Sequence, residues 1–295
     1  MKRRPLGRDL GLSIRMAIAL VPIAFWYLGA AALLLSLLVG TWLDREWEGF
    51  LGAVFITVGG AALFWQHVER SESVALRAAR AEEVGPGAAP ELHDLVARVA
   101  AMADLPPPRV AIARSWAPNA FSVGVNERRA VVAFTTELLR SDLTPAELEA
   151  VVAHELAHVA NRDGLVMTLV GVPALVGSRI WNADDLRVRF LMVLYWPWFV
   201  VSVLFMWALS RYREYVADRG AVMITGAPEQ LMSALQKIAG MPARGDLRGG
   251  IAVQALCIVG RQAGWRRFEL FSDHPPLDKR LDRLAAMSRE LGKVA

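Results

Sequence analysis

The sequence contains a single cysteine, Cys257, among 295 residues. One cysteine cannot form an intrachain disulfide, so the fold does not depend on an oxidising compartment. It also cannot build a zinc site made of several thiolates. Small disulfide-rich folds and thiolate zinc cages are therefore excluded.

The chain also lacks a run of basic residues. Its formal net charge is only +4, and its arginines and lysines are scattered along the sequence. Proteins that bind nucleic acid usually concentrate positive charge on one face. We therefore expect no nucleic-acid partner.

Long stretches of the chain carry no charge at all. The first, residues 16–40, would form a helix about 37 Å long, enough to cross a hydrocarbon core of about 30 Å. A cleaved signal peptide is the alternative, but this stretch is long for one and a second uncharged run follows at 50–66. With 55% hydrophobic residues overall, the chain is more apolar than most soluble domains. The composition predicts an integral membrane protein.

Two more apolar runs come later, at 164–178 and 190–210. The last run is long enough to cross a bilayer. The run at 164–178 contains Pro173 and is marginal alone. It could be the end of a longer helix, or a hairpin that does not fully cross. We expect about four transmembrane helices.

Basic residues near the first two runs predict the orientation. The tail before residue 16 is rich in lysine and arginine, whereas the loop between the runs carries only Arg45. Three arginines follow the second run. By the positive-inside rule, the N-terminus and the chain after residue 66 face the cytoplasm of a cell inner (plasma) membrane. The loop between the third and fourth runs does not follow the rule cleanly.

The segment 67–163 is water-soluble in character. Residues 71–83 have the pattern of an exposed helix, and 91–103 also have helical periodicity. Alternating apolar residues then predict a small sheet. Its strands are expected at 109–114, 120–125 and 129–135.

The next helix has a clear start. Thr144 can be its N-cap, Pro145 suits the first helical position, and Glu147 completes a capping box. No breaker occurs before Asp163. We therefore expect one helix from Pro145 through Asp163 that runs onward towards the bilayer.

This helix contains the segment HELAH, with His154, Glu155 and His158. Histidines four apart lie on one helical face, about 6 Å between Cβ atoms, so both rings can reach one metal ion. Glu155 could then contact the attacking water without being a ligand. The alternative is an amphipathic helix whose histidines are merely packed or solvated.

A catalytic zinc site needs a third protein ligand and one open position. Glu214, in the segment SRYREYVADRGA, is the best of several acidic candidates that include Asp163. Asp218 lies four residues later and could accept a hydrogen bond from a ligand histidine. The alternative is a solvated, salt-bridged start of a helix. If both late apolar runs cross, or form a hairpin, the two ligand segments meet at the same membrane face.

These segments together resemble the HtpX-like membrane zinc metallopeptidases, which are of the gluzincin type and related to the Ste-type CAAX prenyl endopeptidases. The resemblance rests on HELAH followed by VANRD, on the two late apolar runs and on SRYREYVADRGA. Two more segments agree, PNAFSVG at 118–124 and FSDHPPLDKRLDRL at 271–284. The resemblance covers nearly the whole chain.

The resemblance implies a mainly α integral membrane protein with a cytoplasmic zincin-like α+β protease domain and a small β-sheet. It implies that His154, His158 and Glu214 hold one zinc ion per chain, that Glu155 is the catalytic base and that Asp218 orients a ligand. Four segments follow from this assignment. They are the tail and first two spans at 1–66, the cytoplasmic helices, sheet and HELAH helix at 67–163, the third and fourth membrane segments at 164–210, and the remaining helical part with the third ligand at 211–295.

The resemblance also implies a substrate-binding strand. Asn119, Ala120 and Phe121 would lie on an edge strand that holds an extended peptide. An ordinary structural strand is the alternative. His274 would stabilise the oxyanion or approach the metal, or it simply begins the last helix, where the two prolines after it suit a first turn.

The expected activity is hydrolysis of peptide bonds. Zinc lowers the pKa of its water and polarises the scissile carbonyl, while Glu155 moves the proton from the water to the leaving amine. The resemblance and the nearness to lipid imply polypeptide substrates, namely membrane or misfolded proteins, in protein quality control under stress. The alternatives are a prenyl-protein processing protease and a non-catalytic scaffold that keeps zinc, although a purely structural site would gain nothing from Glu155.

Overall fold

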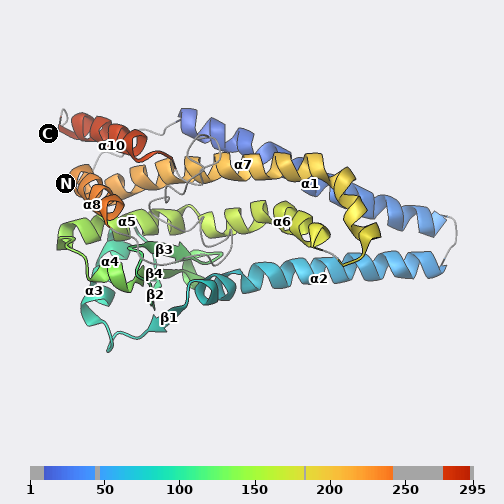
Figure 1. Cartoon of the computed structure of the whole chain (residues 1–295), viewed down its shortest axis with the longest axis horizontal. Coiled ribbons are helices and arrows are strands. Elements are labelled where there is room, and N and C mark those ends of the chain that lie inside the picture. The colour runs from blue at the N-terminus through green and yellow to red at the C-terminus, as the bar shows by residue number, and fades with distance from the viewer. Residues whose placement is uncertain (1–9, 44–46, 183, 242–274, 293–295) are drawn as a thin grey trace.

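The computed structural model describes residues 10–43, 47–182, 184–241 and 275–292. Over these residues the protein is mostly helical, with one small sheet (Figure 1). The helices are α1 (Leu10–Leu43), α2 (Trp47–Ala78), α3 (Pro90–Met102), the 3-10 helix η1 (Glu127–Arg129), α4 (Thr136–Leu139), α5 (Pro145–Ala160), α6 (Asp163–Trp181), α7 (Leu186–Thr225), α8 (Pro228–Gly240) and α10 (Leu277–Gly292). The strands are β1 (Ala81–Val84), β2 (Arg109–Ala113), β3 (Ala120–Val123) and β4 (Val131–Thr135).

The sheet is mixed, with the strand order β1-β2-β4-β3. Strands β2 and β4 are parallel, and the two outer strands pair antiparallel with them. The three predicted strands are confirmed as β2, β3 and β4. The expected helix over 71–83 is wrong at its end, because α2 stops at Ala78 and β1 begins at Ala81. Between them Arg80 adopts a positive φ of 52°, which turns the chain back onto β2.

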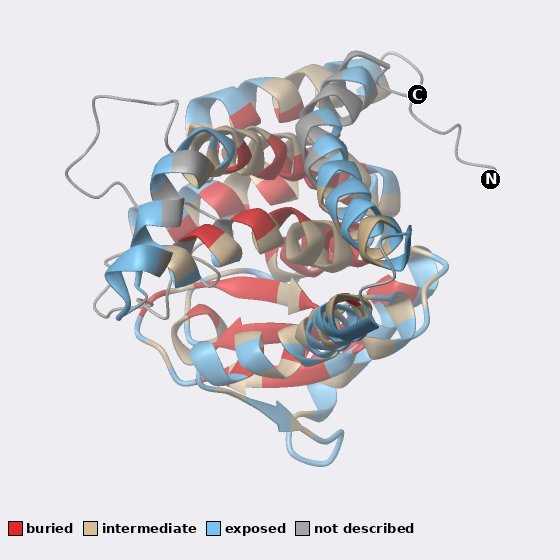
Figure 2. Ribbon diagram, turned by 90° about the vertical axis from the view of Figure 1, so that its right-hand side faces the viewer, coloured by how far each residue is buried: buried red, intermediate tan, exposed pale blue. Residues whose placement is uncertain are grey.

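Helix α5 lies in the centre of the end of the molecule that contains the sheet. It packs on β3 and β4 on one side, while α7 and α8 contact its other side. Figure 2 shows that buried residues gather where the sheet and these helices face each other. Phe134 from β4, Val151 from α5 and Leu235 from α8 belong to this one core. The histidine helix is therefore enclosed rather than solvated.

The start of α5 is as expected, but its end is not. Thr144 and Glu147 form the predicted capping box. The predicted continuous helix through Asp163 is wrong, because α5 ends at Ala160 and Arg162 has a φ of 55°. The turn brings the start of α6 against the end of β3, since a Cβ on Gly164 would lie 2.2 Å from the carbonyl oxygen of the residue that follows β3.

The long helices α1, α2, α6 and α7 run alongside one another in Figure 1. Within the described residues, α2 and α6 are long and apolar enough to cross a membrane, judged by length and composition. Many large apolar side chains on these long helices are exposed, among them Leu33, Phe55 and Leu63. An expectation of four complete crossings stays a prediction.

A hydrogen bond joins α1 to α6 at a proline. Pro173 lies inside α6 and has no N–H to donate to the carbonyl of Leu169, four residues earlier. The hydroxyl of Tyr27 in α1 donates to this carbonyl at 2.8 Å. A backbone carbonyl left without a donor is costly in lipid. The Tyr27 hydroxyl therefore replaces the N–H donor that Pro173 lacks, and this hydrogen bond links α1 to α6.

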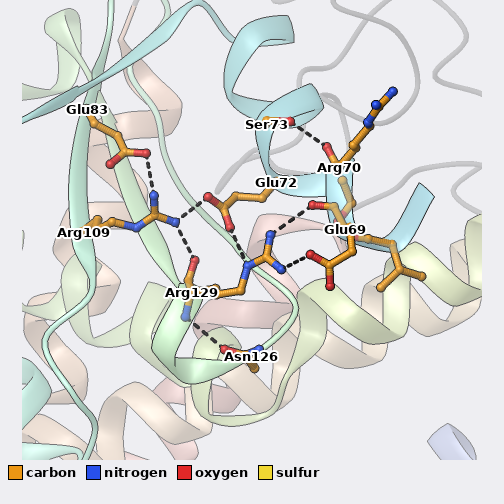
Figure 3. A network of polar contacts seen from close by, with 10 residues as sticks. Glu69, Arg70, Glu72, Ser73, Glu83, Arg109, Asn126 and Arg129 are labelled. Carbon is orange, nitrogen blue, oxygen red and sulfur yellow. Dashed lines mark hydrogen bonds and ion pairs between the residues drawn. The ribbon is translucent and has the colours of Figure 1, made fainter. Parts of the chain in front are cut away.

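The C-terminal end of α2 is joined to the sheet by a network of ion pairs (Figure 3). Glu72 bonds the guanidinium of Arg109 in β2, and Glu69 bonds that of Arg129 in η1. Arg109 also donates to Glu83 of β1 at 2.7 Å. The side chain of Glu72 is only 11% exposed, whereas that of Glu69 is 40% exposed. Loss of the more buried carboxylate, Glu72, should therefore cost more stability than loss of Glu69.

We expect Glu72→Gln to lower the free energy of unfolding by about 1–3 kcal/mol, because it weakens charged hydrogen bonds away from water. Glu69→Gln is the matched control and should cost less than about 1 kcal/mol. Thermal unfolding of the full chain in detergent measures both. Equal effects of the two substitutions would contradict the role assigned to burial.

Candidate active site

His154 and His158 present their rings next to each other on α5. The ring centroids lie 4.8 Å apart and the planes are nearly perpendicular. Both residues are buried, as is Glu155 between them. One possible ligand atom from each of the three lies within 4.8 Å of the others. The HELAH segment therefore forms a compact set of donors inside the protein.

Glu214 of α7 reaches both histidine rings. Its two carboxylate oxygens lie 3.5 Å from Nε2 of His154 and 3.5 Å from Nε2 of His158. Two ligands on one tetrahedral zinc, at about 2.0–2.2 Å each, stand about 3.4 Å apart. The buried Nε2 of His154 makes no hydrogen bond within the described part of the chain. These donors fit a shared zinc ion in both spacing and chemistry.

The opposite nitrogen of each ring faces an aspartate. Nδ1 of His158 lies 2.6 Å from Oδ2 of Asp163, the first residue of α6. Nδ1 of His154 lies 3.1 Å from Oδ1 of Asp218 on α7. Asp163, considered above as a third ligand, thus lies behind His158 rather than beside Glu214. The Nε2 atoms of both rings face the carboxylate of Glu214.

Two buried arginines lie behind these aspartates, and sequence reasoning missed both. Arg280 of α10 donates to Asp218 at 2.8 Å and 2.6 Å and lies 3.2 Å from Glu214. Arg213 of α7 lies 3.1 Å from Asp163. A signal for Arg280 was present, because it shares a helical face with the buried Leu284 four residues later. A charged residue on an apolar face indicates a buried partner.

The carboxylates strongly favour positive charge in this site. Burial alone lowers the pKa of His158, but hydrogen bonds from the ring to Asp163 and Glu214 outweigh it and raise the pKa to about 10. For His154, contacts with Asp218 and Glu214 likewise outweigh burial and raise the pKa. An environment that stabilises protonated imidazole also suits a divalent cation.

Helices α5 and α7 approach each other closely beside the site. A Cβ on Gly220 of α7 would lie 2.5 Å from the Cβ of Ala157. Ala157 lies on α5 directly before His158. Only glycine at this point lets the helices come together without displacement. The contact holds Glu214 within reach of both rings.

The predicted substrate residues lie on β3 or beside it, at one edge of the sheet. The backbone N–H of Asn119 donates to the side-chain hydroxyl of Thr135 at 2.8 Å, and the backbone N–H of Thr135 donates to the carbonyl oxygen of Asn119 at 2.9 Å. The side chains of Ala120 and Phe121 are buried in the core, so only their backbone could contact a peptide. Strand β3 also contacts α5, the histidine helix. His274 lies outside the described residues.

Comparisons with known proteins show the family to which the chain belongs. Residues 86–288 match Peptidase family M48. The chain belongs to this family. It is 42% identical to a "Protease HtpX homolog" of Moorella thermoacetica, over 98% of each chain. It is 39% identical to "Protease HtpX homolog 1" of Streptomyces coelicolor, over 97% of this chain and 96% of the relative.

The fold is also found in a solved structure of much lower sequence identity. The crystal structure of S. mikatae Ste24p superposes with a TM-score of 0.50 at 17% identity, and covers 94% of this chain and 67% of that one. At this identity the likeness shows the fold alone. Family membership confirms the predicted resemblance and the prediction of a metallopeptidase. Together with the exposed apolar helices, it indicates a membrane metalloprotease.

We expect Gly220→Ala to push α7 away from α5, at a cost of about 1–3 kcal/mol in the free energy of unfolding, and to weaken metal binding. Gly171→Ala on α6 is the matched control, because a Cβ there meets nothing within 4 Å. The control should be neutral or slightly stabilising. Thermal unfolding and a chelator competition measure both effects. Unchanged metal affinity in Gly220→Ala would contradict the importance of this contact.

Zinc binding should release protons, because the pKa of His158 is raised to about 10 and only a neutral ring coordinates a metal. The apparent affinity should therefore rise with pH up to about 10. Calorimetry in buffers with different heats of ionisation measures the number of protons released. An affinity that stays constant between about pH 6 and about pH 9 would contradict this expectation.

Proposed function

We propose that the chain is a zinc-dependent endopeptidase in which His154, His158 and Glu214 hold the metal. The observation that carries the proposal is the convergence of both Nε2 atoms on the two oxygens of one carboxylate, each at 3.5 Å. The donor set of two histidines and one glutamate is that of hydrolytic zinc sites with one open position. A site meant only for structure would be closed by a fourth ligand.

Glu155 is the proposed general base. It follows His154 directly and has a carboxylate oxygen within 4.8 Å of a nitrogen of each histidine ring. When bound, zinc would lower the pKa of a water molecule and polarise the scissile carbonyl. Glu155 then takes the proton from the attacking water and delivers it to the amine nitrogen as the peptide bond breaks. Asp218 and Arg280 keep the ring of His154 and the carboxylate of Glu214 in place during these transfers.

Strand β3 is the proposed platform for the substrate. It lies at an edge of the sheet and contacts α5, so an extended peptide added there would lie next to the histidine helix. Main-chain hydrogen bonds would give affinity largely independent of sequence. This mode suits an enzyme that cleaves many unfolded segments.

The membrane is the proposed location of the enzyme. Two residues separate α5 from α6, and α7 carries both the apolar run at 190–210 and Glu214. The site therefore lies where these helices would leave the lipid. The basic N-terminal tail and the arginines after the second run support a cytoplasmic site in the inner (plasma) membrane. This location favours membrane proteins or misfolded chains as substrates, in protein quality control.

The experiment is a comparison of wild-type chain with Glu155→Gln in detergent or vesicles. We expect about one zinc per chain in both, cleavage of an unfolded protein by the wild type, and a loss of at least about 100-fold in the variant. Undiminished cleavage by Glu155→Gln would contradict the mechanism. Zinc without turnover by the wild type would instead indicate a scaffold.

A prenylated peptide, tested beside the same peptide without the prenyl group, identifies the substrate class. We expect similar cleavage of both. Cleavage that depends strongly on the prenyl group would contradict a quality-control role and favour prenyl-protein processing.

A further inference from the structure

The two histidines of the site are supported in the same way by different elements. Nδ1 of His154 faces Asp218, which accepts two hydrogen bonds from Arg280. Nδ1 of His158 faces Oδ2 of Asp163, and this oxygen also lies 3.1 Å from Nε of Arg213. Each histidine ring thus contacts an aspartate, and that aspartate in turn contacts a buried arginine.

We propose that Asp163 and Arg213 are positioning residues that orient the ring of His158 for metal binding. The inference rests on the proposed function and extends it to a second pair of side chains. Asp163 accepts the hydrogen bond from Nδ1–H and so leaves Nε2 of His158 to the metal. A carboxylate behind a ligand histidine fixes both the tautomer and the rotation of the ring, and makes the ring more basic.

The geometry of the turn after α5 explains how Asp163 reaches His158. On a continuous helix, residue 163 would lie about 7.5 Å along the axis from residue 158 and about 140° around it. The positive φ of Arg162 breaks the helix and lets the side chain of Asp163 point back, so that its oxygen comes within 2.6 Å of the ring. The break in the helix is therefore what makes the contact possible.

Arg213 holds the aspartate in turn. Asp163 is 2% exposed and Arg213 is 6% exposed, so both charges are removed from water and each needs the other. Arg213 precedes Glu214 on α7, whereas Asp163 begins α6. The pair therefore links the start of α6 to the part of α7 that carries Glu214, beside the ring of His158. The orientation of His158 depends on how α6 and α7 pack.

The experiment separates positioning from simple structural support. Asp163→Asn removes the charge, leaves Arg213 buried without its anion, and should lower both the melting temperature and the zinc affinity. We expect the affinity to fall about 10-fold to about 100-fold. The double variant Asp163→Asn with Arg213→Gln replaces the ion pair by two neutral amides. It should recover the melting temperature but not the zinc affinity.

Zinc affinity is measured on the detergent-solubilised full chain by competition with a coloured chelator, and Co²⁺ absorption reports the ligand geometry. Glu147→Gln is the matched control. Glu147 is also a buried carboxylate on α5, paired with Lys237 at 2.8 Å, but lies about 10 Å along the helix from His154. It should lower the melting temperature and leave zinc affinity and the Co²⁺ spectrum unchanged.

Each outcome decides one claim. Affinity within about twofold of wild type in Asp163→Asn, set against the roughly tenfold loss expected, would overturn the inference. Recovery of affinity together with melting temperature in the double variant would also overturn it, because the role would then be structural. The proposed function fails separately, if His154→Ala binds zinc as tightly as the wild type.

Discussion

The close contact between α5 and α7 is the constraint on which the site depends. Two histidines on one helix can meet a metal, but the third donor has to come from another helix at the correct height. Gly220 has no side chain at the point where the helices approach closely, and a Cβ there would lie 2.5 Å from that of Ala157. The carboxylate of Glu214 then lies 3.5 Å from each Nε2 atom. Helix α5 is held in position by the sheet, by its capping box and by the core, and α7 packs closely against it.

The charges of the site are balanced in pairs. Several carboxylates are buried within a few ångströms of one another, which would be strongly unfavourable if they were left alone. Arg280 offsets Asp218 and Glu214, and Arg213 offsets Asp163. A buried ion pair contributes little net stability, but loss of one partner is costly. These arginines therefore specify the geometry of the carboxylates more than they stabilise the fold.

Local patterns in the sequence predicted the elements that depend on local chemistry. The capping box at Thr144, the three strands β2, β3 and β4 and the family resemblance are confirmed. The features that were missed depend on tertiary contacts or on single backbone dihedral angles. Nothing in the residues around Arg162 predicts a positive φ. The break after α5 and the contact of Asp163 with His158 could therefore not be predicted from the sequence. Strand β1 forms because β2 offers it an edge, although its own residues favour a helix. The position of Arg280 is fixed by a partner 62 residues earlier in the chain.

X-ray absorption at the zinc edge of the purified full chain tests the proposed metal site most directly. We expect two imidazole nitrogens and oxygen donors in the first coordination shell, at about 2.0–2.2 Å, with no sulfur at about 2.3 Å. Glu214→Ala keeps both imidazoles but removes the carboxylate donor, so this variant should bind zinc much more weakly. A sulfur neighbour in the wild type, or an unchanged zinc affinity in that variant, would contradict the claim that α5 and α7 together hold the metal.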